Sequence, residues 1–376
     1  MKRIGENMEE KYYYWLHNVP GIGRKMFRKI LEYTTPEELY KRNQEKEFGF
    51  LSDKQKENIS KSREQWNLLK EWEILKTKSI KLLIHGKNDY PEKLSHISDP
   101  PILLYCKGRT DILDKPTVAV IGARACSNYG SLAAKELGRE LAAMGIVVVS
   151  GMARGIDGIC QLAALESGGE SIGVLGSGVE VCYPPENRFL YERLQSQGAV
   201  ISENPPFTAP HAGLFPQRNR IISGLADIVV VMESREKSGT LITVDMALEQ
   251  GKEIYAMPGR MTDPVSRGCN KLIKQGAGLM LSPREFVEEI CPILQLKYQN
   301  TKRNPKQIFT EDECMIAEAL DVSLKTIEEI YQKVKVKNAE ITMGKVMEIV
   351  LELQMKNILK EECGYYSLKE GLCKFQ

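Results

Sequence analysis

VAVIGARACSNYG, residues 118–130, combines a short β-branched apolar run, a turn at Gly122 and a helical pattern that begins near Tyr129. The same order recurs in VVVSGMARGIDGICQLAALESGG at 147–169 and in GVLGSGVEVCYPPENRFLYERL at 173–194. Apolar strands that alternate with helical patterns are typical of a parallel sheet with crossover helices. We therefore expect an α/β fold with a mostly parallel sheet in the middle of the chain.

This middle segment also differs from its flanks in composition, since 21 of the 30 glycines fall between 116 and 290. Its predicted strands are Thr117–Ile121, Ile146–Ser150, Ser171–Leu175, Ala199–Ser202, Ile228–Met232 and Glu253–Met257. Its predicted helices are 129–144, 157–167, 186–197, 217–224, 239–251 and 267–276. GIVVVSG and ADIVVVME are apolar on both faces, which places these two strands in the centre of the sheet.

The chain of 376 residues is too long for one ordinary domain. Residues 1–80 read as an N-terminal helical domain, and a short strand region near KLLIHG opens the core at 81–290. Residues 291–305 (CPILQLKYQNTKRNP) are predicted to be a linker. A separate, small helical domain follows at 306–376.

Bulk composition excludes several classes of protein. The formal net charge is only +2, so any anion-binding surface must be local. Nine cysteines lack paired spacing and only four histidines are present, which argues against a zinc site and predicts no metal. Scattered cysteines are typical of a reducing cytoplasm. Since no apolar run approaches the roughly 20 residues of a membrane span, we expect a soluble, cytoplasmic protein without membrane contact.

Glycine turns and helix starts follow the strands, and in a parallel sheet these meet at one edge, where ligands bind. Free N–H groups at helix N-termini and arginine side chains both favour phosphate. For Gly122 a tight turn and a ligand contact are equally good explanations, and for Arg154 a role in loop structure is favoured over a phosphate contact. The candidate residues in these loops are Gly122, Arg124, Ser127, Gly151, Arg154, Gly176, Ser177, Gly178, Ser238 and Gly239. Ser127 and Asp157 are also predicted to cap helices.

The usual catalytic and nucleotide motifs are missing from the sequence. Neither a complete G-x-G-x-x-G nor a G-x-x-x-x-G-K-[ST] occurs, so no dinucleotide cofactor and no ATP hydrolysis are expected. The only G-x-S-x-G run, GESIG at 169–173, leads into a predicted strand and is therefore not a nucleophile elbow, and His211 is the only histidine between 116 and 290. The pattern predicts a protein that binds a phosphate-rich ligand, without catalytic residues and without a cofactor.

FPQRNRIISGLADIVVVME, residues 215–233, places two arginines and an asparagine directly before a buried strand. Phe215 is a candidate stacking surface for a base, although a phenylalanine is more often part of the core. If 217–224 is helical, Arg218 and Arg220 point in different directions. One of them is then free to meet a ligand while the other pairs internally, with Asn219 between them.

Several of these segments together resemble the DprA/Smf family of DNA-processing proteins. The resemblance rests on GARACSNYG, SGMARGID, GSGVEVCYPPEN, ISENPP, FPQRNRIISGLAD, SGTLITVDMALEQGK and SRGCNKLIKQGA, in order and in spacing. It implies a Rossmann-like, doubly wound core that binds single-stranded DNA, forms a homodimer and loads the RecA recombinase in natural transformation, without a chemical reaction. Arg124 matches the DNA-pocket arginine of the family, and Phe215, Arg218, Asn219 and Arg220 match its F-P-x-R-N-R motif.

The sequence departs from the family pattern at a few positions. Ala123 replaces the usual serine, Glu180 an aspartate and Gln161 a histidine. The loss of a hydroxyl at position 123 removes one possible contact with DNA. None of these changes is expected to break the fold.

The flanking segments resemble known modules as well. LHNVPGIGRKMFRKILEY at 16–33 resembles a helix-hairpin-helix motif in a degenerate SAM-like domain, for which DNA binding and plain packing are equally good explanations. Residues 306–376 resemble a winged helix, and Glu348 and Glu352 on its third helix favour a protein-interaction or structural role. The alternative function is that of a LOG-type nucleotide phosphoribohydrolase, with Asp245 in place of its catalytic glutamate.

Overall fold

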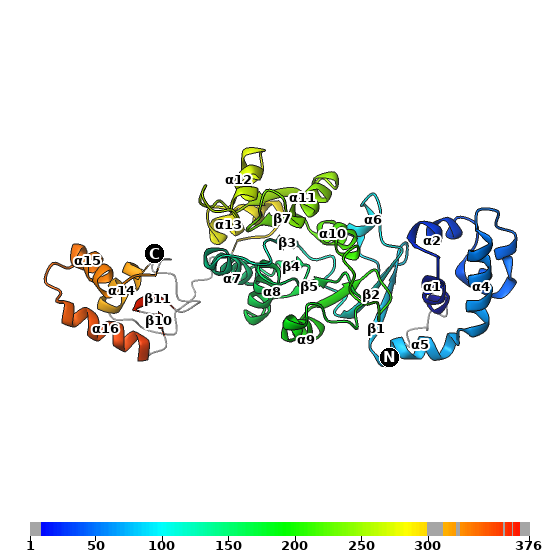
Figure 1. The fold of residues 1–376 in the computed structure, drawn as a ribbon, viewed down its shortest axis with the longest axis horizontal. Helices are drawn as coiled ribbons and strands as arrows, with labels where there is room; N and C mark the ends of the chain where they lie inside the picture. Colours follow the sequence, from blue (N-terminus) through cyan, green and yellow to red (C-terminus); the bar gives the residue numbers. More distant parts are fainter. Residues whose placement is uncertain (1–8, 299–310, 321–323, 356–357, 363, 369–376) are drawn as a thin grey trace. The chain divides into compact units, whose positions relative to one another are not determined.

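A nine-stranded sheet, in the order β1-β2-β6-β5-β4-β3-β7-β8-β9, forms the centre of the computed structural model (Figure 1). The structure describes residues 9–298, 311–320, 324–355, 358–362 and 364–368. Within these residues the strands are β1 (Ile80–Ile84), β2 (Leu103–Gly108), β3 (Thr117–Ile121), β4 (Val147–Ser150), β5 (Ser171–Val174), β6 (Ala199–Ser202), β7 (Ile228–Val231), β8 (Glu253–Ala256) and β9 (Gly278–Leu279). The six predicted strands are all present, each within one residue of its predicted ends.

Strand pairing confirms an α/β fold with a largely parallel sheet. All pairs from β6 to β9 are parallel, whereas β2 pairs antiparallel with β6, and β1 antiparallel with β2. The sequence indicated only a strand region near β1; β2 and the two-residue β9 were not predicted. β2 escaped notice because its run LLYCKG is followed by no helical crossover.

Helices cover both faces of the sheet (Figure 1). One face carries α7 (Asn128–Ala143), α8 (Ile156–Glu166), α9 (Arg188–Gln197) and α13 (Pro283–Ile293); the other carries α6 (Glu92–Ser95), α10 (Leu214–Leu225), α11 (Gly239–Glu249) and α12 (Arg267–Lys274). Strand β3 shows why, since Val118 and Val120 join the core under α7 and α8 while Ala119 and Ile121 join the core under α10 and α11. Alternate residues of a strand face opposite sides, and here both sides are apolar.

Five α-helices precede the sheet: α1 (Glu10–His17), α2 (Arg24–Leu31), α3 (Pro36–Arg42), α4 (Asp53–Gln65) and α5 (Leu68–Thr77), with the 3-10 turn η1 (Gln44–Lys46) after α3. Their core continues onto the edge of the sheet, because Trp15 and Phe27 share one apolar cluster with Leu82 and Tyr105 of β1 and β2. Met1–Tyr298 accordingly form one unit of the chain.

His17 makes the stability of this shared core sensitive to acid. Its Nδ1 lies 2.8 Å from the hydroxyl of Tyr105, and burial lowers the pKa of the imidazole from 6.5 to about 4. The unfolded chain therefore takes up a proton that the folded chain refuses, so the free energy of unfolding should fall as the pH drops from about 6.5 to about 4. Urea unfolding across this range measures the effect. A His17→Gln variant should flatten the pH profile, and an exposed control, His211→Gln, should leave it unchanged.

The last helix of the first unit extends into the segment predicted to be a linker. Helix α13 continues to Ile293 and buries Cys291, and Leu296 and Tyr298 pack against the same core. The first residues of 291–305 therefore belong to the α/β unit, because apolar side chains at 290, 291, 294 and 296 cover the sheet. The remainder of the predicted linker, from 299 onward, lies outside the described residues.

Gln299–Gln376 form the second unit. Its described residues contain α14 (Glu311–Leu320), α15 (Ile327–Lys337), α16 (Met343–Met355) and an antiparallel pair, β10 (Leu359–Glu362) and β11 (Tyr365–Leu368). Ile316, Val334, Leu353 and Leu368 lie in its own apolar core. None of the helices in the described parts of either unit is both long and apolar enough to cross a membrane.

Candidate functional site

A small pocket lies at the carboxyl edge of the parallel strands, where the loops after β3, β4 and β5 meet the first turn of α10. Its lining residues are Arg124, Gly151, Ala153, Arg154, Tyr183, Pro184, Phe215 and Arg218. The structure thus brings together five of the residues predicted from sequence, from three separate segments. Helix α10 begins at Leu214 rather than near 217, so that Phe215 lies in its first turn and faces this edge.

A cation and two aromatic rings form the open side of the pocket. The guanidinium carbon of Arg124 lies 5.8 Å from the centre of the Phe215 ring, and Phe215 stacks on Tyr183 with ring centres 5.5 Å apart at 28°. Arg124 is exposed and Tyr183 is 39% exposed. Flat rings beside an exposed arginine can stack a base and hold its phosphate. Tyr183 was missed from sequence, although it lies in the loop that follows β5, one of the loops predicted to meet at this edge.

Phe215 is held in place from behind by the loop after β5. A Cβ at Gly176 would lie only 2.8 Å from the Phe215 ring, so the ring rests directly on the backbone there. Ser177 is buried and donates its hydroxyl to the carbonyl of Val181, and Gly178 packs against the backbone of Pro205. This glycine loop is therefore the support of the aromatic ring, and its residues are not among those that line the pocket.

Arg218 forms the buried floor. It donates to the carbonyl oxygen of Gly151 at 2.9 Å and to that of Val174, which joins the ends of β4 and β5. A Cβ at Gly151 would lie 2.5 Å from the guanidinium, so only glycine leaves room. Burial lowers the pKa of Arg218 to about 10, against the attraction of Asp157, and the side chain stays charged at neutral pH. A fixed positive charge therefore lies directly beneath the pocket.

Asp157 has a different role from the one predicted. The N-cap of α8 is Gly155, and the Asp157 carboxylate instead accepts a hydrogen bond from the backbone N–H of Gly151 at 3.1 Å. Burial raises the pKa of this carboxyl, and the charge of Arg218 counteracts the shift. The side chain points back to the end of β4 because its positively charged neighbour lies there.

Arg220 is turned away from the pocket. Its guanidinium donates to both carboxylate oxygens of Glu203, at 2.7 and 2.8 Å, and to the carbonyls of Asp99 and Gln217. Of the two arginines in the motif, Arg218 faces the predicted ligand site and Arg220 pairs internally. Asn219 accepts a hydrogen bond from Arg218 at 3.3 Å. Arg154 is exposed at the rim and pairs with Glu186.

The N-terminus of α7 already holds an anion of the protein. Glu233 follows β7, is 1% exposed, and accepts hydrogen bonds from the backbone N–H of Ser127 at 2.8 Å and from the Ser127 hydroxyl. The same hydroxyl accepts from Gly130 N–H at 3.0 Å, which confirms Ser127 as the cap of α7. A carboxylate thus occupies the position for which the sequence suggested a phosphate.

The remaining candidates lie beside the pocket. Ser238 caps α11 through Thr240, and the Thr240 hydroxyl donates to the carbonyl of Gly122 at 3.4 Å, which places Gly239 next to that turn. These residues are not part of the described pocket lining. Asp245, the acid of the hydrolase alternative, is exposed on α11 and does not line the pocket either.

The N-terminal helix-hairpin segment directs part of its charge inward. Arg24 and Arg28 of α2 form ion pairs with Asp99 at 2.9 and 3.1 Å, and Lys29 lies over the ring of Phe50. Four basic residues follow the glycine hairpin (Arg24, Lys25, Arg28 and Lys29), and the two arginines among them are thus engaged with the core. A separate position, Gln161, stands where the family has histidine. Its buried side chain accepts a hydrogen bond from the backbone N–H of Met152 and donates one to the hydroxyl of Ser171.

Comparison with known proteins identifies relatives of this α/β unit. Residues 81–291 match the family model of DNA recombination-mediator protein A. The DNA processing protein DprA of Streptococcus pneumoniae is 42% identical over 200 residues, which is 53% of this chain and 71% of that protein.

Solved structures agree with the sequence comparison. The structure of DNA processing protein A from S. pneumoniae superposes with a TM-score of 0.64 at 32% identity and covers 77% of this chain and 99% of that one. A DNA processing protein A from Helicobacter pylori, whose structure describes a single-stranded DNA binding mode, has a TM-score of 0.53 at 31% identity over 57% of this chain and 96% of that one.

Proposed function

Since the chain belongs to the family of DNA recombination-mediator protein A, the DprA/Smf family, we propose that it binds single-stranded DNA at the pocket of Arg124, Tyr183 and Phe215. In this proposal the strand is held, protected and handed on, with no bond made or broken. The observation that supports it best is the exposed Arg124 above the stacked Phe215 and Tyr183 rings. Stacking tolerates any base, and the guanidinium holds the phosphate next to it.

The buried Arg218 lines the inner end of this pocket. It contributes positive charge under the pocket while its N–H groups are occupied by the carbonyls of Gly151 and Val174. Because the oppositely charged Asp157 lies beside it, this charge acts on a bound strand only at short range, and the exposed contacts are left to Arg124 and the aromatic rings. The net charge of only +2 makes such local attraction necessary.

Fluorescence anisotropy with labelled oligo-dT tests the proposal. We expect binding that weakens as salt rises, and weaker binding of a duplex of equal length, because paired bases cannot stack on Phe215 and Tyr183. Absence of oligo-dT binding at low salt would exclude this function.

Arg124→Ala should lower the affinity for oligo-dT and reduce the slope of log affinity against log salt by about 0.7, the contribution of one phosphate contact to a single strand. The fold should be unaffected, because the Arg124 side chain is exposed. Anisotropy over a salt series measures both quantities. Arg109→Ala is the matched control, since Arg109 follows β2 at the opposite edge of the sheet, beside Gly198. Equal salt slopes for the two variants would contradict a phosphate contact at Arg124.

The wider role follows from the family and forms part of the proposal. We assign to the chain a homodimeric state, residence in the cytoplasm and transfer of bound single strands to RecA during recombination or natural transformation. The second unit, with Glu348 and Glu352 on α16, is assigned to protein contacts. Light scattering tests the dimer, and RecA filament formation on the pre-bound strand, with and without this protein, tests the transfer.

A further inference from the structure

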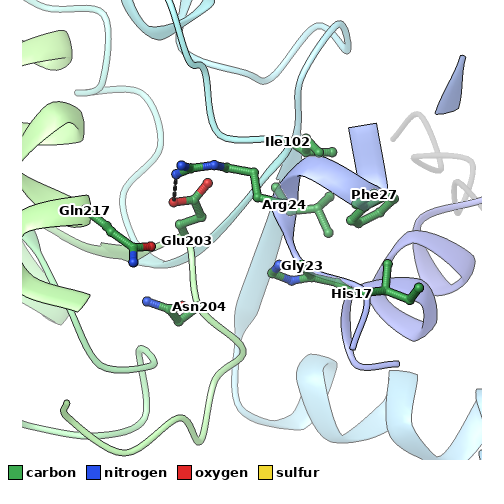
Figure 2. Close-up of a pocket in the computed structure, with 10 residues that line it drawn as sticks. His17, Gly23, Arg24, Phe27, Ile102, Glu203, Asn204 and Gln217 are labelled. Atoms are coloured by element: carbon green, nitrogen blue, oxygen red, sulfur yellow. Dashed lines mark ion pairs between the residues drawn. The ribbon is translucent and has the colours of Figure 1, made fainter. Parts of the chain in front are cut away.

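A second cavity, of about 220 Å³, lies between the N-terminal helices and the sheet (Figure 2). It is bounded by α2, by the start of β2, by the segment that follows β6 and by α10. The lining residues are His17, Ile22, Gly23, Arg24, Phe27, Ile102, Leu103, Glu203, Asn204 and Gln217. Neither the sequence motifs nor the pocket at Phe215 account for it.

Two side-chain amides give the cavity a hydrogen-bonding wall. Figure 2 shows Gln217 and Asn204 on the side opposite Phe27. The Gln217 side chain is exposed, and among the described residues its amide makes no hydrogen bond. Asn204 donates its Nδ2 to the carbonyl of Gly176 at 3.0 Å, which leaves its Oδ1 as an acceptor. An amide offers a donor and an acceptor side by side, and this pattern matches the edge of a nucleobase.

The charges around the cavity are balanced. Arg24 pairs with Asp99 at 2.9 Å and with Glu203 at 3.5 Å, and Figure 2 shows the second of these pairs among the residues that line the cavity. A phosphate would have to compete with two carboxylates for this arginine. The opposite wall is apolar, with Phe27, Ile102 and Leu103 all buried. A neutral, flat group with polar edges therefore fits the lining better than an anion does.

Helix α10 connects this cavity with the pocket described above. Phe215 and Arg218 contribute to the first pocket and Gln217 to the second, within little more than one turn of the same helix. Asn204 contacts Gly176, the residue on which the Phe215 ring rests. A strand whose base stacks on Phe215 can thus continue past the start of α10 toward the second cavity.

We propose that this cavity binds a nucleobase, with the amides of Gln217 and Asn204 reading its edge and Arg24 and Glu203 at the rim. The inference rests on the proposed binding of single-stranded DNA when the base belongs to a strand. A free nucleoside presents the same chemistry and is tested separately. When the base belongs to a strand, the cavity adds a second contact with the DNA. It also adds some base preference, because the pocket at Phe215 stacks any base.

Gly23→Leu is the variant that blocks the cavity. A Cβ at Gly23 meets nothing within 4 Å and the residue has an ordinary extended φ of −80°, so a larger side chain can be added without a backbone clash. Gly49→Leu is the matched control, because Gly49 is also exposed, lies in the turn between η1 and α4, away from the cavity lining, and an added Cβ there also meets nothing within 4 Å. Gln217→Met removes the amide at an exposed position and serves as a second variant.

The experiment measures anisotropy of oligonucleotides and maps photocrosslinks from oligonucleotides that contain 5-bromodeoxyuridine. We expect crosslinks to peptides containing residues 22–27 as well as to peptides of the first pocket, and about tenfold weaker binding for Gly23→Leu, equivalent to about 1.4 kcal/mol. Binding equal to that of Gly49→Leu, together with no crosslink at 22–27, would overturn the base-of-a-strand proposal.

Titration with adenosine and thymidine separates this proposal from the function proposed above. If wild-type protein binds no oligonucleotide but binds a nucleoside, and Gly23→Leu and Gln217→Met abolish that binding, the cavity is a free-nucleoside site and the strand-binding function fails. If oligonucleotides bind through Arg124 and Phe215 while both cavity variants behave as wild type toward every probe, the cavity proposal fails and the strand-binding function stands.

Discussion

Phe215→Ala should weaken the binding of oligo-dT by about 1–3 kcal/mol, a loss of about 5- to 150-fold in affinity, because base–aromatic stacking contributes about this much per base. The ring stacks on Tyr183 with centres 5.5 Å apart, and the Arg124 guanidinium lies over it. Its removal therefore takes away the aromatic surface that both neighbouring side chains contact. Anisotropy with labelled oligo-dT at fixed salt measures the loss.

Two controls separate stacking from a general loss of structure. Phe215→Trp keeps a flat ring and should retain most of the affinity, and Phe207→Ala removes an aromatic ring that is 55% exposed and lies outside the pocket. Thermal unfolding of each variant shows whether Gly176, which supports the ring, has lost its packing. Unchanged oligo-dT binding by a folded Phe215→Ala variant would assign the ring to the core alone.

Arg218→Met should lower the free energy of unfolding by about 3–5 kcal/mol. This is the usual cost of removing one member of a buried pair of charges, because the other charge then remains buried and unpaired. Methionine has a similar length but cannot donate to the carbonyls of Gly151 and Val174, and it leaves the buried Asp157 without its positive neighbour. Urea unfolding at neutral pH, followed by far-UV circular dichroism, measures the change.

Two further variants show how much of this loss comes from the buried charge of Arg218. Arg235→Met removes an exposed arginine near the same edge of the sheet and should change stability by less than about 0.5 kcal/mol. Adding Asp157→Asn to Arg218→Met should recover part of the loss, because the buried carboxylate is then no longer charged. If Arg218→Met unfolds at the same urea concentration as wild type, the buried guanidinium has no structural role.

Sequence patterns predicted the sheet well because each central strand is a short apolar run between turns. TVAVI and IVVV bury both faces, and no competing helical pattern covers them. β2 and the edge strand β9 were missed for a physical reason: one lacks a crossover helix and the other has only two residues. Helix α10 begins three residues earlier than predicted because Pro216 fits the first turn of a helix, where its missing N–H is not needed.

The candidate site was predicted in part. The position of a loop at the carboxyl edge follows from the strand pattern, and so Arg124, Gly151 and Phe215 were identified as neighbours. Which of two nearby arginines faces the pocket depends on Glu203 and Asp99, which lie 17 and 121 positions away from Arg220. Local sequence carries no information about such distant partners.

Glu233 shows how one acidic residue can change what this sheet edge accepts. Its carboxylate fills the electropositive end of α7, the place where many nucleotide-binding proteins of similar architecture hold a pyrophosphate. A free nucleotide that approached this end would meet a negative charge already in place, because the Glu233 carboxylate packs directly against Gly130 in the first turn of α7. A diphosphate would have to displace this buried carboxylate to bind here, which disfavours it as a ligand, whereas the proposed strand-binding pocket at Arg124 and Phe215 does not include this helix end.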